Sequence, residues 1–146
     1  MGYREQFLGF EGRLKRTDFW VCMICITLLS LCLNFAGAVL MGLPLDGMVH
    51  HPTVGSAVIV LLLWPMLAVL TKRGHDRGRP MTWTVATLLT LNVLGVLVMA
   101  ASWPAYPMYL AVMAYAFVDY GVLPGASGDN RYGPPPGVVE RPAPPM

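Results

Sequence analysis

FWVCMICITLLSLCLNFAGAVLM, residues Phe19 to Met41, is an apolar run of 23 residues without a charged side chain. A helix of that length measures about 34 Å, slightly more than the ~30 Å hydrocarbon core of a bilayer. Backbone groups in lipid must be hydrogen-bonded within their own segment, so the run is predicted to be a helix. It exceeds the roughly 7–15 apolar residues of a signal peptide, and we expect it to be retained as a membrane span.

Three further apolar runs follow, each close to the length needed to cross a bilayer. They comprise residues 54–70, 82–101 and 105–123. Only three residues separate the last two runs, which predicts a tight helical hairpin. The fold class predicted for this chain is therefore an all-α membrane protein, a bundle of four transmembrane helices.

The composition agrees with that class. Hydrophobic residues make up 55% of the chain and charged residues only 12%, and the mean hydropathy is +0.56. A soluble domain has roughly 25% charged residues, about twice as many. The net charge of +2 is too small to indicate a nucleic-acid partner.

The positive charges indicate how the helices are oriented. All ten Lys and Arg residues lie before the first run, between the second and third, or after the fourth, and the other two connections have none. Short connections rich in Lys and Arg stay in the cytoplasm. We therefore predict a multi-pass membrane protein with both termini cytoplasmic. The ten residues are Arg4, Arg13, Lys15, Arg16, Lys72, Arg73, Arg77, Arg79, Arg131 and Arg141.

One membrane domain with a short segment on either side is expected. Residues 1–17 carry large apolar side chains among charges, which is typical of an amphipathic segment lying on the membrane surface. Residues 18–123 form the four-helix transmembrane domain. Residues 124–146 are rich in Gly and Pro and cannot bury a core, so they are predicted to be an extended or disordered cytoplasmic tail.

The most polar stretch, KRGHDRGRP at residues 72–80, is predicted to be the cytoplasmic loop between the second and third spans. His75 and Asp76 have the chemistry of a base and its orienting group, or of half a metal site. A juxtamembrane basic cluster also suits anionic lipid headgroups. The third reading is structural, with Asp76 paired to Arg13 or Arg16. The structural reading is favoured, because a single His-Asp dipeptide is a weak catalytic signal.

Three polar residues fall inside the predicted spans, where burial is expensive and function is the default suspicion. Asn34 and Asn92 are expected to form hydrogen bonds between helices. Asp119 lies about one turn from the cytoplasmic end of the fourth run, and we expect it to pair with a loop arginine. If these three side chains lined one path, the protein would be a small transporter or channel component.

The three cysteines are expected to pack as small apolar side chains. Cys22, Cys25 and Cys32 all lie in the first run, and no second group of Cys or His residues could complete a zinc site. No metal or cofactor is expected.

Three segments together resemble a family of small bacterial inner-membrane proteins, the domain of unknown function 805 family. FEGRLKRTDFW at residues 10–20 is similar to its Gly-Arg-x-x-Arg-x-x-Phe-Trp opening. RGHDRGR at residues 73–79, followed by Trp83, resembles its Arg-x-His-Asp-x-Gly-Arg loop. GDNRYGP at residues 128–134 matches its Gly-x-Asn-x-Tyr-Gly-Pro tail. Order and spacing agree over nearly the whole chain, although Lys15 and Gly74 depart from the family pattern.

The resemblance implies a multi-span membrane protein and gives no catalytic residues. All three motifs lie on the face that the charges assign to the cytoplasm, so we expect their polar residues to converge beneath the bundle. We call this candidate site the polar plate. Three roles are open for it: binding lipid, binding a partner protein, or only holding the protein's own segments together. Its members are Arg13, Arg16, Lys72, Arg73, His75, Asp76, Arg79, Asn130 and Tyr132.

The function favoured by the sequence is a non-enzymatic accessory, scaffolding or lipid-associated component of a larger membrane assembly. Its expected partners are membrane lipids, including anionic ones, and other membrane subunits or further copies of the chain. The alternatives are the transporter or channel component described above, and an enzyme at the membrane surface that uses His75 and Asp76.

Overall fold

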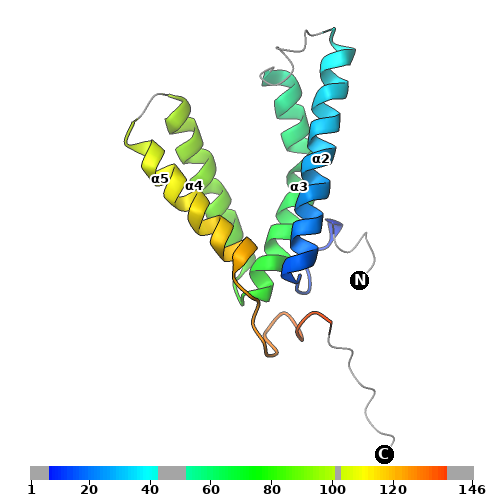
Figure 1. The fold of residues 1–146 in the computed structure, drawn as a ribbon, viewed down its shortest axis with the longest axis vertical. Coiled ribbons are helices and arrows are strands. Elements are labelled where there is room, and N and C mark those ends of the chain that lie inside the picture. Colours follow the sequence, from blue (N-terminus) through cyan, green and yellow to red (C-terminus); the bar gives the residue numbers. More distant parts are fainter. Residues whose placement is uncertain (1–6, 43–51, 101–102, 138–146) are drawn as a thin grey trace, which may run out of the picture.

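The computed structural model describes residues 7–42, 52–100 and 103–137, and within these ranges the chain is helical with no β-strand. The only extended pairing among the described residues is a single bridge between Asn130 and Gly133. Figure 1 shows the elements, which are α2 (Arg16–Leu40), α3 (Pro52–Asp76), α4 (Met81–Met99), α5 (Ala105–Ala116) and the π-helical turn η1 (Phe117–Val122).

Two helical hairpins form a V. α2 packs along α3, and α4 packs along α5, whereas the two pairs diverge from a shared end (Figure 1). The turn between α3 and α4 lies at that shared end, where Gly78 adopts a φ of 72°. A glycine in this left-handed conformation is the usual way to end a helix, since a Cβ would be strained there. We call the two ends of the V the plate end and the open end.

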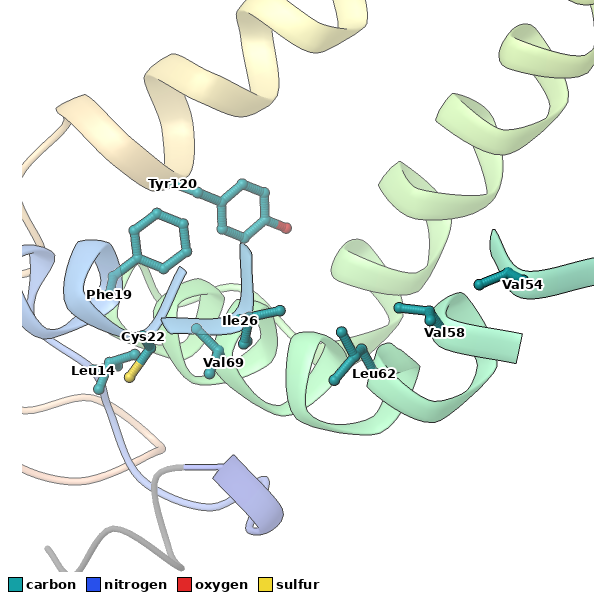
Figure 2. Close-up of a cluster of buried hydrophobic side chains, with 9 residues drawn as sticks. All are labelled: Leu14, Phe19, Cys22, Ile26, Val54, Val58, Leu62, Val69 and Tyr120. Carbon is teal, nitrogen blue, oxygen red and sulfur yellow. The ribbon is translucent and has the colours of Figure 1, made fainter. Parts of the chain in front are cut away.

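The buried apolar core runs along the α2–α3 hairpin and stops at the joint of the V. Figure 2 shows that Val54, Val58 and Leu62 continue toward the open end, while Tyr120 of η1 reaches Phe19 of α2 at the joint. The remaining members of the core are Leu14, Cys22, Ile26 and Val69. The second hairpin contributes little to this core, so apolar packing alone does not hold the two hairpins together.

Large apolar side chains cover the outside of the helices. Leu31, Val60 and Val96 are each more than 60% exposed. α2, α4 and residues Val54–Asp76 of α3 are long and apolar enough to cross a membrane. Exposed apolar faces of this kind match a lipid environment rather than water.

The fourth apolar run does not form one α-helix. The sequence predicted a single span at residues 105–123, but α5 has 12 residues and the chain then continues as the six-residue π-helical turn η1. The bond from the Leu123 N–H to the Val118 carbonyl, 3.0 Å long, has the i→i−5 spacing of a π-helix. The wider turn places Tyr120 and Gly121 against α2 and Asp119 against the turn between α3 and α4, and all three are buried.

Two predicted boundaries at the plate end are wrong. Lys72 to Asp76 are helical, so α3 extends through the first half of the predicted loop and only Arg77 to Pro80 form the turn. Residues 124–137 form turns beneath the bundle instead of an extended or disordered tail. In both places, charged side chains find partners in distant segments, which local composition does not reveal. The rest of the predicted tail and residues 1–6 lie outside the described ranges.

Candidate functional site

The centre of the polar plate is a carboxylate held between two guanidinium groups. Asp76, the last residue of α3, accepts a hydrogen bond of 3.0 Å at Oδ1 from Arg13 Nε and one of 2.5 Å at Oδ2 from Arg73 Nη1. The side chains of Arg13, Arg73 and Asp76 are each at most 4% exposed. Both oxygens of one buried anion are thus used by two buried cations, in the charge-assisted geometry that gives the strongest hydrogen bonds.

Backbone contacts place these three side chains. Arg73 and Asp76 are three residues apart on α3, so they share one helix face. Arg13 arrives from the segment before α2, where the Leu14 N–H donates to the Lys72 carbonyl over 3.2 Å. Gly12 has a φ of 83°, which a residue with a Cβ rarely adopts, and this turn brings Arg13 beneath the end of α3.

The segment after η1 completes the surroundings of Arg13. The Arg13 guanidinium donates to the Gly128 carbonyl over 2.8 Å, to the Gly133 carbonyl over 3.2 Å and also to the Ala126 carbonyl. The Ala126 N–H in turn donates to the Asp76 carbonyl over 2.8 Å. These bonds explain why the chain after residue 124 folds back under the bundle, although its composition predicts no core.

Gly125 permits the closest approach in the plate. A Cβ placed on this residue would lie 1.9 Å from Asp76 Oδ2, far inside van der Waals contact. The chain after η1 can therefore cross the ion-pair centre only because position 125 has no side chain. Nothing in the sequence distinguishes Gly125 from the other glycines of the tail.

The imidazole of His75 is covered by Tyr132. The two rings are stacked, with centroids 3.6 Å apart and an interplanar angle of 7°. His75 Nδ1 is 3.2 Å from the Gly12 carbonyl, and the Asn130 side chain donates to the His75 carbonyl over 2.9 Å. The Asn130 Oδ1 then accepts from the Tyr132 N–H over 2.9 Å, which fixes the tyrosine. His75 thus serves as a packing surface, and the carboxylate of Asp76 is directed to arginines.

Arg73 and one further arginine, Arg16, bond to carbonyls at the end of η1. Arg73 Nε donates to the Tyr120 carbonyl over 2.7 Å, and Arg16 Nη1 donates to the Val122 carbonyl over 3.0 Å. The last carbonyls of a helix have no partner within it and carry partial negative charge. The two hairpins are therefore joined by cations of the first that satisfy the helix end of the second.

A second ion cluster lies on the other side of η1. Asp119 Oδ1 accepts from Arg79 over 3.0 Å and from Arg77 over 3.3 Å. Arg79 also donates to the Tyr115 hydroxyl, and its guanidinium lies 4.7 Å from the centroid of the Trp83 ring. Asp119 is 2% exposed, whereas the two arginine side chains are 23% and 27% exposed. This cluster fixes η1 to the turn between α3 and α4.

The positive charges of the plate are mostly not available to an external ligand. Arg13, Lys72 and Arg73 are 4%, 0% and 0% exposed. Among the described cations of the plate, Arg16 is exposed and Arg79 is partly exposed, with 27% of its side chain accessible. Lys72 and Arg73 therefore expose no surface through which they could bind lipid headgroups directly.

The polar residues within the spans are not brought together. The Asn34 amide donates to the Ser30 carbonyl and the Asn92 amide to the Leu88 carbonyl, each over about one turn of its own helix. Asn92 is exposed on α4, and Asp119 belongs to the ion cluster at the plate end. The expected interhelical bonds of the two asparagines are thus replaced by bonds to their own backbones, and the three side chains line no common path.

Several contributors were not found from the sequence. Tyr115 and Gly125 were outside the predicted plate, and so was the hydrogen bond of 3.1 Å between the Thr84 and Tyr120 hydroxyls. The expected pairing of Asp119 with a loop arginine is confirmed, and Arg77 and Arg79 both take part in it, although Arg77 was not assigned to the plate. The backbone carbonyls that receive Arg13, Arg16 and Arg73 left no signal, because every residue has a carbonyl.

The chain matches a protein family described as "Protein of unknown function (DUF805)" over residues 7–134. Similar curated proteins of Escherichia coli K12 are the uncharacterized protein YiiR and the inner membrane proteins YhaI and YhaH. YiiR is 29% identical over 91% of this chain and 89% of its own. YhaI is 25% identical over 90% and 89%, and YhaH is 25% identical over 90% of each chain. No solved structure matches.

Proposed function

This chain belongs to the DUF805 family of proteins of unknown function and is a multi-pass protein of the inner membrane, and we propose that it acts there as a non-enzymatic accessory component of a larger membrane assembly. In this proposal the polar plate is a clamp that sets the angle between two hairpins. The hairpins then offer their apolar faces to neighbours in the membrane.

The observation that carries the proposal is the internal use of the plate's charges. Both oxygens of Asp76 are bonded to Arg13 and Arg73, and these arginines also bond to carbonyls of the chain after Asp119. A catalytic or ligand-binding cluster keeps at least one group open to its substrate. A buried network whose central groups are bonded to one another instead specifies how segments pack, which is the role supported here.

The arrangement of His75 supports the same conclusion. Its Nδ1 lies at the Gly12 carbonyl, and Tyr132 covers one face of its ring. A general base needs a free nitrogen within reach of a substrate and often a carboxylate that orients it. Asp76 is engaged by the two arginines, so the His75-Asp76 pair proposed as a base and its orienter lacks that geometry.

The topology proposed for this function has four spans, with both termini in the cytoplasm. The 12 residues of α5 give about 18 Å at 1.5 Å each, and the six residues of η1 extend this helix further toward the ~30 Å of the hydrocarbon core. All the described Lys and Arg residues lie at the plate end or in the turn attached to it. The preference of such residues for the cytoplasm supports placing the plate end there.

Native purification tests the proposal. The full-length chain, tagged and expressed at its natural level, is extracted in a mild detergent and separated by size, and the associated proteins are identified by mass spectrometry. We expect it to migrate with one or more other membrane proteins. The Asp76→Asn variant should lose these partners, whereas Asp129→Asn, an exposed carboxylate in the same part of the chain, should keep them. A wild-type chain that runs alone, without attached protein, would contradict the proposal.

A further inference from the structure

An apolar groove lies inside the V between the two hairpins. It encloses about 360 Å³ and is lined from all four helices and η1. We call it the inter-hairpin groove and define it by Trp20, Met23, Met66, Leu88, Leu91 and Met113. Trp20 and Met113 are 37% and 43% exposed, so the groove is open along one side.

The groove continues toward the open end of the V. A second apolar pocket of about 240 Å³ lies against α2 and α3 and shares Met23 and Met66 with the first. Together the two pockets follow α3 from Val58 to Leu70. These 12 steps of 1.5 Å give about 18 Å, close to the ~15 Å thickness of one leaflet of the hydrocarbon core.

The dimensions favour a chain-like occupant over a helix. A partner helix crosses the whole ~30 Å hydrocarbon core, whereas the two connected pockets extend over about 18 Å of α3, close to a single leaflet. An extended hydrocarbon chain needs length rather than width, and the two connected pockets supply length. Methionines at the junction, Met23 and Met66, have flexible side chains that adapt to chains of different shape.

A cation stands at the plate end of the groove. Arg16 is exposed and donates to the carbonyl of Val122, the residue after the groove-lining Gly121. Trp20 lies one helical turn further along α2 and donates its indole N–H to the Gly121 carbonyl over 3.0 Å. An arginine followed by a tryptophan at the membrane interface matches the order of phosphate and acyl chain in a phospholipid.

We propose that the inter-hairpin groove binds one acyl chain of an anionic phospholipid from the leaflet at the plate end, with its phosphate at Arg16. This inference goes beyond the proposed function, because it requires membrane insertion but no partner protein. The lipid would fill the gap that the diverging hairpins leave, so that neither wall of the groove stays without contacts.

The experiment uses the full-length protein in detergent, stripped of lipid and then incubated with equal amounts of phosphatidylglycerol and phosphatidylethanolamine. Native mass spectrometry counts the retained lipids. We expect one phosphatidylglycerol per chain. Leu88→Trp fills the groove and should abolish retention, whereas Leu89→Trp, on the same helix but 60% exposed and outside the groove, should not. Equal retention by these two variants would overturn the proposal.

A matched pair of charge variants tests the headgroup. Arg16→Gln should lower the preference for phosphatidylglycerol over phosphatidylethanolamine by about fivefold. Lys15→Gln removes the same charge from the neighbouring residue, which lines a different pocket, and should leave the preference unchanged. If both variants behave alike, Arg16 does not hold the phosphate and the proposed headgroup site is wrong.

A photo-crosslinking residue at Leu91, inside the groove, provides a readout that does not depend on a tryptophan variant folding correctly. In membranes it should form an adduct with phospholipid. The same crosslinking residue at the exposed Leu89 should show far less selectivity among the phospholipids that it captures. Crosslinking from Leu91 to another protein or to a second copy of the chain would overturn the lipid proposal. That result would still agree with the proposed accessory function, so the two proposals fail separately.

Discussion

The two ends of the V are held by different chemistry. At the plate end, Arg13, Arg16 and Arg73 donate to backbone carbonyls of η1 and the segment after it, and Asp119 of η1 is bonded to arginines of the turn between α3 and α4. Toward the open end, Leu40 of α2 and Met99 of α4 are each 87% exposed, and an apolar groove separates the hairpins. Figure 1 shows the hairpins meeting at one end and diverging toward the other.

This difference follows from the solvent. Lipid is as apolar as leucine, so apolar helix faces gain little by leaving lipid for each other. Polar and charged groups near a membrane gain much more from finding a partner. The contact between hairpins is therefore confined to one end, where polar groups act together with a small apolar contact of Phe19 and Trp20 with Tyr120 and Phe117, and the apolar remainder is left for lipid or for a partner.

The largest effect is expected where the plate's central anion is removed. Asp76→Asn leaves the buried guanidinium groups of Arg13 and Arg73 without their countercharge. Breaking a buried ion pair from one side costs about 3–5 kcal/mol. Unfolding by sodium dodecyl sulfate in mixed micelles measures this loss. Asp129→Asn, the same change at an exposed position, should be neutral. If both variants were equally stable, the plate would not be a clamp.

A smaller loss is expected from crowding the same centre. Gly125→Ala places a methyl group 1.9 Å from Asp76 Oδ2, so the backbone of the crossing segment must shift. Overpacking of this kind costs about 1–3 kcal/mol. Gly128→Ala is the matched control, since a Cβ there has no atom within 4 Å. The same unfolding titration reports both, and a stable Gly125→Ala chain would show that the crossing segment is loosely held.

The second ion cluster should control the angle of the V more than the stability. Asp119→Asn weakens bonds to Arg77 and Arg79, which are about a quarter exposed and so can regain water. We expect a loss of about 2 kcal/mol, typical of hydrogen bonds to a charged group. Spin labels at Leu40 and Met99, in a chain with its three cysteines replaced, should give a broader distance distribution.

The control for this measurement is Asp18→Asn. That carboxylate is 38% exposed and pairs over 3.6 Å with Lys15, the N-cap residue of the same helix. Exposed pairs contribute about 0–1 kcal/mol, so the spin-label distances should be unchanged. An unchanged distribution in Asp119→Asn as well would place control of the angle elsewhere.

The smallest effect is expected at the ring stack. Tyr132→Leu removes the stacking on His75, worth about 1 kcal/mol, while Tyr132→Phe keeps it. Amide hydrogen exchange of residues 126–133 should become faster in the leucine variant and stay near wild type in the phenylalanine variant. Equal exchange in the two variants would assign the fixing of this segment to Asn130 and Arg13 rather than to the stack.

The positions of the helices could be predicted from the sequence, whereas the contacts among the residues of the plate could be predicted only in part. Apolar runs located α2, α3 and α4 to within a few residues, except where α3 continues to Asp76. Lys and Arg are good helix formers, so the end of the apolar run at Leu70 does not mark the end of the helix. The pairing of Asp76 with Arg13 was one of the sequence alternatives, and its second partner, Arg73, lay in the same motif.

The sequence by itself determined that this chain is an all-helical membrane protein and which polar segments belong to its plate, because both follow from local hydropathy and from motifs read in order. Only the tertiary structure decided that the plate's charges are bonded to one another, that Gly125 lets the tail cross Asp76, and that the hairpins leave an apolar groove. These features depend on backbone carbonyls and on the angle between helices. Neither is encoded by residue type at any one position.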